Sequence, residues 1–393
     1  MRDILFMVWQ YLSFYKVKTS ILVLSITLIF YIPSGLKVIV DQSADYLTAK
    51  AAATPLIAGS KGSSLELVLN SLYFDSKVPE TLRYGEYSRI ANSGLATALP
   101  LNTRFKAGHF PIIGTTLDYF DYRGLILAEG GNISLLGDCV LGAKAAQKMG
   151  VSTGDQVMSS PENLFNLAGE YPLSMHVAGV FEYADTPDDD AVFVDIKTAW
   201  VIEGLAHGHQ DLAEPEAAAG VLKQEGNVIV GNASVTQYNR ITPDNMDSFH
   251  FHGDPEGFPV TAIIAIPHDG KSSAILRGKY LGDEEDVQIV NPLEVMTELL
   301  ETVFTVQSYV VTAIAVIGLS TLATAVLVFL LSLRLRQREI QTMHKIGGSR
   351  GRIVAILASE ILAVLMLGAG ISFILTIITA NYGPALLKGI LLG

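Results

Sequence analysis

Three long runs of apolar residues lie near the two ends of the chain. The first is uncharged over residues 19–36, the second is uncharged over 302–333, and the third covers 353–380 with Glu360 as its one interruption. A helix rises about 1.5 Å per residue and a bilayer core is roughly 30 Å thick, so each run is long enough to cross a membrane. The pattern predicts three transmembrane helices, within residues 17–40, 292–333 and 353–380.

Shorter segments flank these runs. Residues 1–16 carry apolar side chains at helical spacing and are expected to form an amphipathic helix in the membrane interface, the alternative being a plain extension of the first span. Asn291-Pro292 is a typical helix start, so 292–333 is expected to be one helix whose first part rises from the membrane as a stalk. Asn381, Gly383 and Pro384 are expected to end the third helix, which leaves 381–393 as a short tail.

A cleaved signal peptide is the alternative for the first run. Ala49, Ala51 and Ala53 form a small-residue pattern of the kind found at cleavage sites. That pattern lies well beyond the end of the apolar run, so the run is expected to stay in the protein as a membrane anchor.

Residues 41–291, between the first and second spans, mix strand and helix patterns and are predicted to form an α+β domain. Strands are expected at 65–74, 114–120, 176–183, 191–195, 260–266 and 287–290. Helices are expected at 79–92, at 271–280 and within 139–150, where Gly150 ends the helix. Residues 204–222 and 241–257 are rich in His, Gly, Pro and acidic residues and are expected to be excursions from this core.

The distribution of charge indicates which side of the membrane each part occupies. The net charge is -12, but residues 41–301 hold 36 acidic and 16 basic residues, a net of -20. The loop 334–352 has six basic residues against Glu339 alone, and the N-terminus adds Arg2, Lys16 and Lys18. Basic residues favour the cytoplasmic side. We therefore expect a multi-pass membrane protein whose N-terminus and loop 334–352 face the cytoplasm and whose residues 41–301 lie outside.

Composition excludes several classes of protein. Half of the 393 residues are hydrophobic and 17% are charged, which is too apolar for a soluble protein. The acidic balance argues against nucleic acid as a partner, and the single cysteine, Cys139, excludes a disulfide framework within the chain. No ATP site is expected, because the phosphate-loop-like residues 268–272 have Ala265 where the earlier glycine is required.

Four stretches of the chain resemble one known family. They are residues 15–25, 138–157, 177–181 with 188–195, and a segment that contains Arg338-Glu339-Ile340, Lys345-Ile346-Gly347-Gly348-Ser349 and Glu360. The last is the most specific, because it matches the pattern R-E-I … I-G-[AG]-S … E. On these residues the chain resembles the MacB/FtsX-like permeases of type VII ABC transporters, which include the LolC and LolE type. The resemblance covers nearly the whole chain in the right order.

The resemblance implies a non-catalytic permease subunit of a bacterial inner membrane, with its large domain in the periplasm and no substrate path through the membrane. A cytoplasmic ABC ATPase dimer, which binds ATP and Mg, would drive it, and the spans would transmit that motion to the periplasmic domain for export, extraction or metal-linked transport of an envelope substrate. The other implied partners are a second permease copy, identical or related, membrane lipids, and a periplasmic adaptor or binding protein. The residues expected to couple to the ATPase are Arg336, Arg338, Glu339, Ile340, Met343, Lys345, Ile346, Gly347 and Gly348.

The residues of the loop favour the same interpretation. Residues 334–346 are expected to form a basic helix long enough to dock on a partner, Gly347-Gly348 to break it, and Ser349 to cap the next helix. The chain departs from the family in its number of spans, because the family usually has four. The missing helix would come from a partner subunit, or the tail would lie on the membrane.

Glu360 lies about two turns into the third span. An ionisable group at that depth is costly and is therefore a candidate functional residue. The alternative, which we favour, is a structural carboxylate near the interface that pairs with a neighbouring helix or with the basic loop.

Histidines form the other unusual feature of the chain. The pattern H-x-H-x-D occurs twice in the predicted periplasmic domain, as His207, His209 and Asp211 and again as His250, His252 and Asp254. In an extended chain alternate residues share a face, so each copy is able to direct two imidazoles and a carboxylate at one ion, most suitably Zn²⁺. The alternatives are a polar surface loop without a role and a metallohydrolase. The second function class is thus a membrane-anchored periplasmic zinc-binding receptor or accessory protein.

Overall fold

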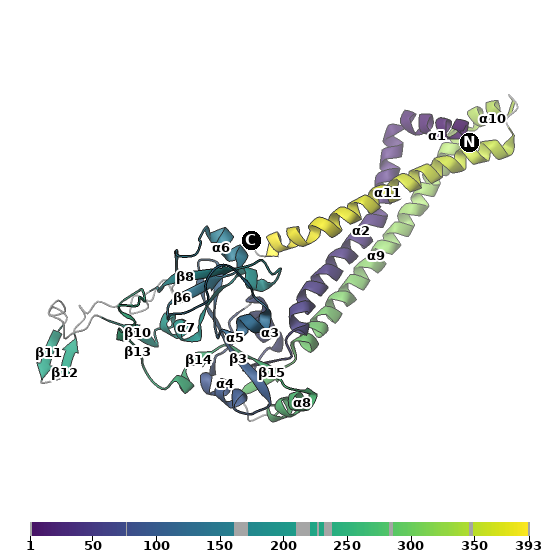
Figure 1. Cartoon of the computed structure of the whole chain (residues 1–393). Coiled ribbons are helices and arrows are strands. Elements are labelled where there is room, and N and C mark those ends of the chain that lie inside the picture. The colour runs from purple at the N-terminus through teal and green to yellow at the C-terminus, as the bar shows by residue number, and fades with distance from the viewer. Residues whose placement is uncertain are drawn as a thin grey trace. The chain divides into compact units, whose positions relative to one another are not determined.

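The structure is a computed structural model that describes residues 2–75, 77–160, 172–209, 221–225, 228–231, 238–282, 286–345 and 349–391. The chain divides into two compact units (Figure 1). The first, here called the helical unit, consists of Met1–Leu47 and Glu298–Gly393, and the second, the α+β unit, is Thr48–Thr297. The sequence predicted 41–291 for the second unit, and both unit boundaries lie inside long helices.

Five helices contribute to the helical unit in the part of the chain that is described: α1 (Arg2–Phe14), α2 (Lys16–Ala52), α9 (Pro292–Leu335), α10 (Gln337–Lys345) and α11 (Arg350–Leu391). Three of them, α2, α9 and α11 as far as Gly383, are long and apolar enough to cross a membrane, as the sequence predicted. Each is longer than its predicted span. Helix α1 is separate from α2 and turns away from it near Tyr15 (Figure 1).

Polar side chains at the predicted positions cap two of these helices. Asn291 Oδ1 accepts hydrogen bonds from the backbone N–H groups of Leu293 at 2.9 Å and Glu294 at 3.2 Å, so α9 begins at Pro292 as predicted. Ser349 Oγ accepts the N–H of Arg352 at 3.4 Å and caps α11. These bonds satisfy backbone donors that the first turn of a helix leaves unpaired.

The prediction that Asn381, Gly383 and Pro384 end the third helix is wrong, because α11 continues to Leu391. Proline removes one backbone hydrogen bond and costs about 3 kcal/mol within a helix, and glycine costs about 1 kcal/mol. A helix of 42 residues retains many other backbone bonds, and transmembrane helices tolerate both residue types. Helix α2 likewise continues through Pro33.

Helices α2 and α11 pack closely within the helical unit. Among the described residues, four hydrogen bonds join the two helices: Tyr31 to Thr379 at 2.9 Å, Ser34 to Thr376 at 2.8 Å, Thr27 Oγ1 to the carbonyl of Gly368 at 3.3 Å, and Gln42 Nε2 to the carbonyl of Ala380 at 2.8 Å. At Gly368 the backbones approach so closely that an added Cβ would lie 2.5 Å from Cγ2 of Ile26. Small residues and hydroxyl groups are the usual means by which helices associate in lipid.

A mixed sheet forms the centre of the α+β unit (Figure 1). Among the described residues it has ten strands, in the order β16-β1-β15-β3-β4-β9-β6-β8-β5 with β7 beside β8. Neighbouring strands are antiparallel except for β4–β9 and β6–β8, which are parallel. The strands are β1 (Leu56–Ser60), β3 (Ala96–Ala107), β4 (Phe110–Thr115), β5 (Leu127–Gly130), β6 (Asp138–Leu141), β7 (Gln156–Met158), β8 (Ser174–Phe181), β9 (Val192–Asp195), β15 (Ala262–Pro267) and β16 (Val287–Val290).

Helices and short turns cover this sheet. They are α3 (Ser64–Tyr73), α4 (Tyr84–Ala91), α5 (Asp118–Arg123), α6 (Ala143–Met149), α7 (Ile196–Ile202), α8 (Gly270–Lys279), and the short 3₁₀ turns η1 (Pro187–Asp190), η3 (Met246–Ser248) and η4 (Pro255–Gly257). Burial of apolar side chains forms two adjoining core clusters, one around Val177 and Val194 and the other around Ile263 and Trp200. The mixed α+β class predicted from the sequence is confirmed.

Two of the predicted strands are wrong or only partly right. Residues 65–74 form helix α3, which Ser63 caps by accepting the N–H of Glu66 at 3.2 Å. Within 114–120 the strand β4 ends at Thr115 and helix α5 follows. The predicted helix within 139–150 is shortened by strand β6, although Gly150 ends α6 in the left-handed conformation as expected.

Three small strand pairs lie outside the main sheet in the described residues. β10 (Ala206–Gly208) pairs with β13 (Phe249–Phe251), β11 (Val221–Glu225) with β12 (Val228–Gly231), and β14 (Pro259–Val260) with β2 (Leu82–Arg83). β10 and β13 come from the two segments that the sequence predicted as excursions from the core.

Candidate functional site

The two histidine segments pair with each other as β10 and β13. The strands are antiparallel, and the register places His207 directly opposite His250. The pairing continues past the strand ends, because the N–H of His252 donates to the carbonyl of Leu205 at 2.9 Å. Opposite residues and alternate residues on an antiparallel pair share one face, so all four histidines lie on the same face.

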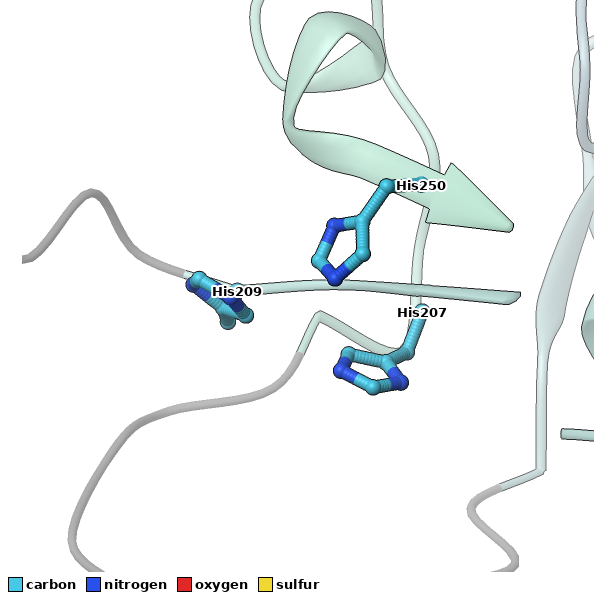
Figure 2. A group of neighbouring side chains, drawn as sticks. All are labelled: His207, His209 and His250. Carbon is cyan, nitrogen blue, oxygen red and sulfur yellow. The ribbon is translucent and has the colours of Figure 1, made fainter. Parts of the chain in front are cut away.

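The imidazole rings form a compact cluster on that face (Figure 2). Ring centroids lie 4.9 Å apart for His207 and His250, 4.6 Å for His207 and His252, and 5.3 Å for His209 and His250. Among the described residues, His207, His209 and His250 each offer a ligand nitrogen, and these nitrogens all lie within 4.8 Å of one another. His207 and His209 are half-buried, whereas His250 and His252 are exposed.

Two features of the cluster favour binding of a cation: the orientation of one ring and the neutral form of another. Nδ1 of His250 lies 3.0 Å from the carbonyl oxygen of Ser248, so a proton on Nδ1 would hold the ring and leave Nε2 as the ligand atom. Burial lowers the pKa of His207 below its ordinary value, and the neighbouring imidazoles of His252, His250 and His209 lower it further. A neutral imidazole is the form that binds a metal.

Within the described residues, the ligands that come together are not those of a single H-x-H-x-D copy. The three-nitrogen group joins residues from both copies, and Asp254 instead caps the turn η4, where it accepts the N–H of Glu256 at 3.1 Å. Asp211 lies outside the described residues. The described ligands that come together are therefore imidazoles from two strands.

A second candidate site lies in the helical unit, where the segment between α9 and α11 begins. Nη1 of Arg336 donates to both carboxylate oxygens of Glu360, at 3.3 and 3.1 Å. The carboxylate is buried, with Glu360 3% exposed, and the guanidinium also lies 3.9 Å from the ring centroid of Tyr11. Glu360 thus pairs with the basic segment, the structural arrangement that we favoured from the sequence.

Five of the other residues predicted to couple to an ATPase lie on helix α10: Arg338, Glu339, Ile340, Met343 and Lys345. Ile340 and Met343, three residues apart, are half-buried, whereas Arg338 and Lys345 are exposed. The helix therefore presents one apolar face and one charged face. The side chain of Glu339 and residues 346–348 lie outside the described part of the chain.

A buried ionic network in the α+β unit was missed by the sequence analysis. Nζ of Lys50, in the last turn of α2, donates to Asp188 of η1 at 2.8 Å, and the hydroxyl of Tyr119 donates to the same carboxylate at 2.7 Å. Burial alone would raise the pKa of Asp188, but the Lys50 ammonium and the hydrogen bonds from Lys50 and Tyr119 hold it below its ordinary value. The same burial raises the pKa of Tyr119.

The phosphate-loop-like residues 268–272 have a structural explanation. Asp269 caps α8 and its carboxylate accepts the N–H of Ser272 at 2.6 Å. This carboxylate lies where a phosphate group would bind the helix N-terminus. A phosphate group at this helix N-terminus would therefore meet a negative charge.

Comparison with known proteins gives structural matches only. No protein-family model matches the chain, and no relative is found among curated proteins. The periplasmic region of MacB from Actinobacillus actinomycetemcomitans is similar at 13% identity and a TM-score of 0.34, over 63% of this chain and 92% of that one. The extracellular domain of the noncanonic ABC-type transporter YknZ from Gram-positive bacteria is similar at 11% identity and a TM-score of 0.32, over 60% and 98%. Similarity at these values carries no argument about function.

Proposed function

We propose that this chain is the permease subunit of an ABC transporter, which transmits ATP hydrolysis by a separate cytoplasmic ATPase to its α+β unit. The observation that supports this most is helix α10, a short basic helix between two apolar helices that is anchored by the buried Arg336–Glu360 pair. The resemblance to MacB/FtsX-like permeases leads to the same residues. This chain would itself hydrolyse nothing.

The anchored base of α10 is suited to transmitting a displacement. A partner that moves the exposed cations of α10 also moves Arg336, one residue before the helix begins. Arg336 is bonded to Glu360 of α11 by two contacts and lies against Tyr11 of α1. Breaking a buried charge pair is strongly unfavourable, so α1, α10 and α11 would move together.

The ends of α2 and α9 are fastened within the α+β unit. Lys50, in the last turn of α2, pairs with Asp188. In the first turn of α9, Glu294 accepts two hydrogen bonds from Arg277 of α8, at 3.0 and 2.9 Å. Each helix is therefore able to transmit a force to the fold around the sheet.

The apolar helices leave room for further partners. Leu319, Leu327 and Leu331 of α9 are 70%, 65% and 58% exposed in the single chain. Large apolar side chains at such exposure require lipid or another helix as their surroundings. We propose that membrane lipids and a second permease copy cover this surface.

Charge reversal on α10 tests the proposal. The full-length chain with Arg338→Glu and Lys345→Glu would be purified from its native membrane, and the co-purifying ATP hydrolysis would be measured. Like charges facing each other at an interface cost several kcal/mol, so we expect at least about a tenfold loss of associated activity.

The matched control is Lys271→Glu with Lys279→Glu, which makes the same charge change at two exposed lysines of α8. This variant should keep the activity of the unmodified chain. The proposal fails if the unmodified chain brings no ATPase activity with it, or if both double variants lose the same amount.

A second candidate function, a metal-binding role for the α+β unit, is favoured by the histidine cluster. The two functions are compatible because the cluster and α10 belong to different units of the chain.

A further inference from the structure

We propose that His207, His209 and His250 bind one Zn²⁺ ion per chain through three imidazole nitrogens on the shared face of β10 and β13. This ligand set differs from either copy of the H-x-H-x-D pattern, because it takes two histidines from one copy and one from the other. His252 lies beside the site rather than in it.

The spacing of the nitrogens suits a metal ion after small rotations. In a tetrahedral zinc site with Zn–N bonds of about 2.0–2.1 Å, the ligand nitrogens lie roughly 3.4 Å apart. The three candidate nitrogens already lie within 4.8 Å of one another, on side chains that are exposed or half-buried. Exposed side chains change rotamer freely, so closing the remaining distance needs no movement of the backbone.

The backbone holds the ligands in register. His207 and His250 are paired residues of the two strands, and the N–H of Tyr238 donates to the carbonyl of Gly208 at 2.9 Å on the far side of β10. The contact between Nδ1 of His250 and the carbonyl of Ser248 orients the third ring. A carbonyl that accepts from the second nitrogen is the usual support for a metal-binding histidine.

The chemistry of the ligands selects the metal. The three imidazoles that the described residues bring together suit zinc, copper or nickel, whereas calcium and magnesium require oxygen ligands. A thiolate ligand is not available, because Cys139 is buried in the core. We assign zinc, which accepts three protein nitrogens in a tetrahedral site and leaves the fourth position open to water. The net charge of -20 over residues 41–301 would raise the local concentration of such cations.

Binding would have a structural consequence. Residues 209–248 connect β10 to β13 in the sequence. An ion held by both segments would join the two ends of that connection and stabilise the strand pair, whose strands are each only three residues long.

Titration calorimetry with Zn²⁺ on the metal-free full-length chain in detergent tests the assignment. We expect one ion per chain, and a loss of affinity of at least about tenfold in each of His207→Ala, His209→Ala and His250→Ala. His252→Ala should lose less than about threefold, because His252 lies outside the three-nitrogen group. Mg²⁺ should show no binding.

The matched control is His109→Ala with His268→Ala, which removes two exposed histidines far from the cluster in sequence. It should bind Zn²⁺ as the unmodified chain does, and all variants should keep the fluorescence of buried Trp200 as a sign of an intact fold. Co²⁺ should give the strong visible absorption of a tetrahedral site in the unmodified chain and lose it in His207→Ala.

Three results would overturn the proposal: no binding to the unmodified chain, equal affinity in the triple variant that lacks all three ligands, or an equal loss in the control. A tenfold loss in His252→Ala would overturn the three-histidine ligand set.

Discussion

Replacing Lys50 by Met should destabilise the α+β unit more than any change of a surface charge. Lys50 and Asp188 are 7% and 2% exposed, and their charged atoms are 2.8 Å apart. Methionine preserves the length of the side chain and the helix propensity of α2. The substitution leaves the Asp188 carboxylate buried with the hydroxyl of Tyr119 as a hydrogen-bond donor but without its ammonium partner.

The size of the effect follows from the burial of both charges. Removing one partner of a buried ion pair costs about 3–5 kcal/mol, whereas an exposed pair is worth about 0–1 kcal/mol. In a domain of this size, each kcal/mol lowers the melting temperature by about 2–4 °C. We therefore expect Lys50→Met to lower it by about 6–20 °C. Lys50→Met with Asp188→Leu should recover most of that loss, because no buried charge then remains unpaired.

Trp200 is a suitable reporter of this unfolding. The chain has two tryptophans, so Trp9→Phe leaves Trp200 alone. Its ring is 3% exposed, its Nε1 donates to the carbonyl of Pro259 at 2.9 Å, and it packs edge-on against Phe258. Loss of this packing on heating changes the fluorescence of the full-length chain in detergent.

Lys148→Met is the matched control, because Lys148 pairs with Asp190 at 3.3 Å while its own side chain is 51% exposed. It should lower the melting temperature by no more than about 4 °C. If Lys50→Met changes the melting temperature no more than Lys148→Met does, the buried pair does not stabilise the unit and the argument from burial is refuted.

Two further predictions concern acid and the helical unit. The pKa of Asp188 is below its ordinary value in the folded state, so its stabilising contribution is complete above about pH 4 and is lost as the pH falls through the lowered pKa. The difference in melting temperature between the unmodified chain and Asp188→Asn should therefore narrow below about pH 4. A difference that stays constant from pH 7 to acid would contradict this. In the helical unit, Gly368→Val would place a Cβ 2.5 Å from Ile26 and should lower the free energy of unfolding by about 1–3 kcal/mol. Trp9 fluorescence, with Trp200 replaced by Phe, would measure this loss. Gly370→Val is the control and should have little effect, because its Cβ would meet nothing within 4 Å.

Helix α3 shows a local pattern that was available in the sequence and was misinterpreted. Apolar residues at 65, 68, 69 and 72 follow helical rather than strand spacing, and Ser63 with Glu66 is a capping pair. The apolar run was short enough to suggest a strand. Elements with strong local signals, such as α9 with its Asn291 cap and Gly150 after α6, were predicted because their causes lie within a few residues.

The histidine cluster shows where prediction from one sequence ends. The spacing within each copy is local, so the sequence predicted that alternate histidines share a face. The pairing of His207 with His250 depends on the register of two strands that are separated by about forty residues of chain, and no local pattern specifies it. The Lys50–Asp188 pair could not be predicted for the same reason, since its partners are 138 residues apart and Lys50 stands among alanines.

The two connections into the α+β unit differ in strength, which has a consequence for the proposed coupling. The Lys50–Asp188 pair at the end of α2 is buried and little affected by salt, whereas Arg277 and Glu294 at the start of α9 have side chains 42% and 59% exposed. Exposed pairs contribute about 0–1 kcal/mol and are screened by ions. The exposed ion pair therefore adds little to the attachment of α9, while the buried pair holds the last turn of α2 to η1. Arg277→Met should therefore leave both the melting temperature and the co-purifying ATP hydrolysis nearly unchanged, whereas Lys50→Met should lower the melting temperature.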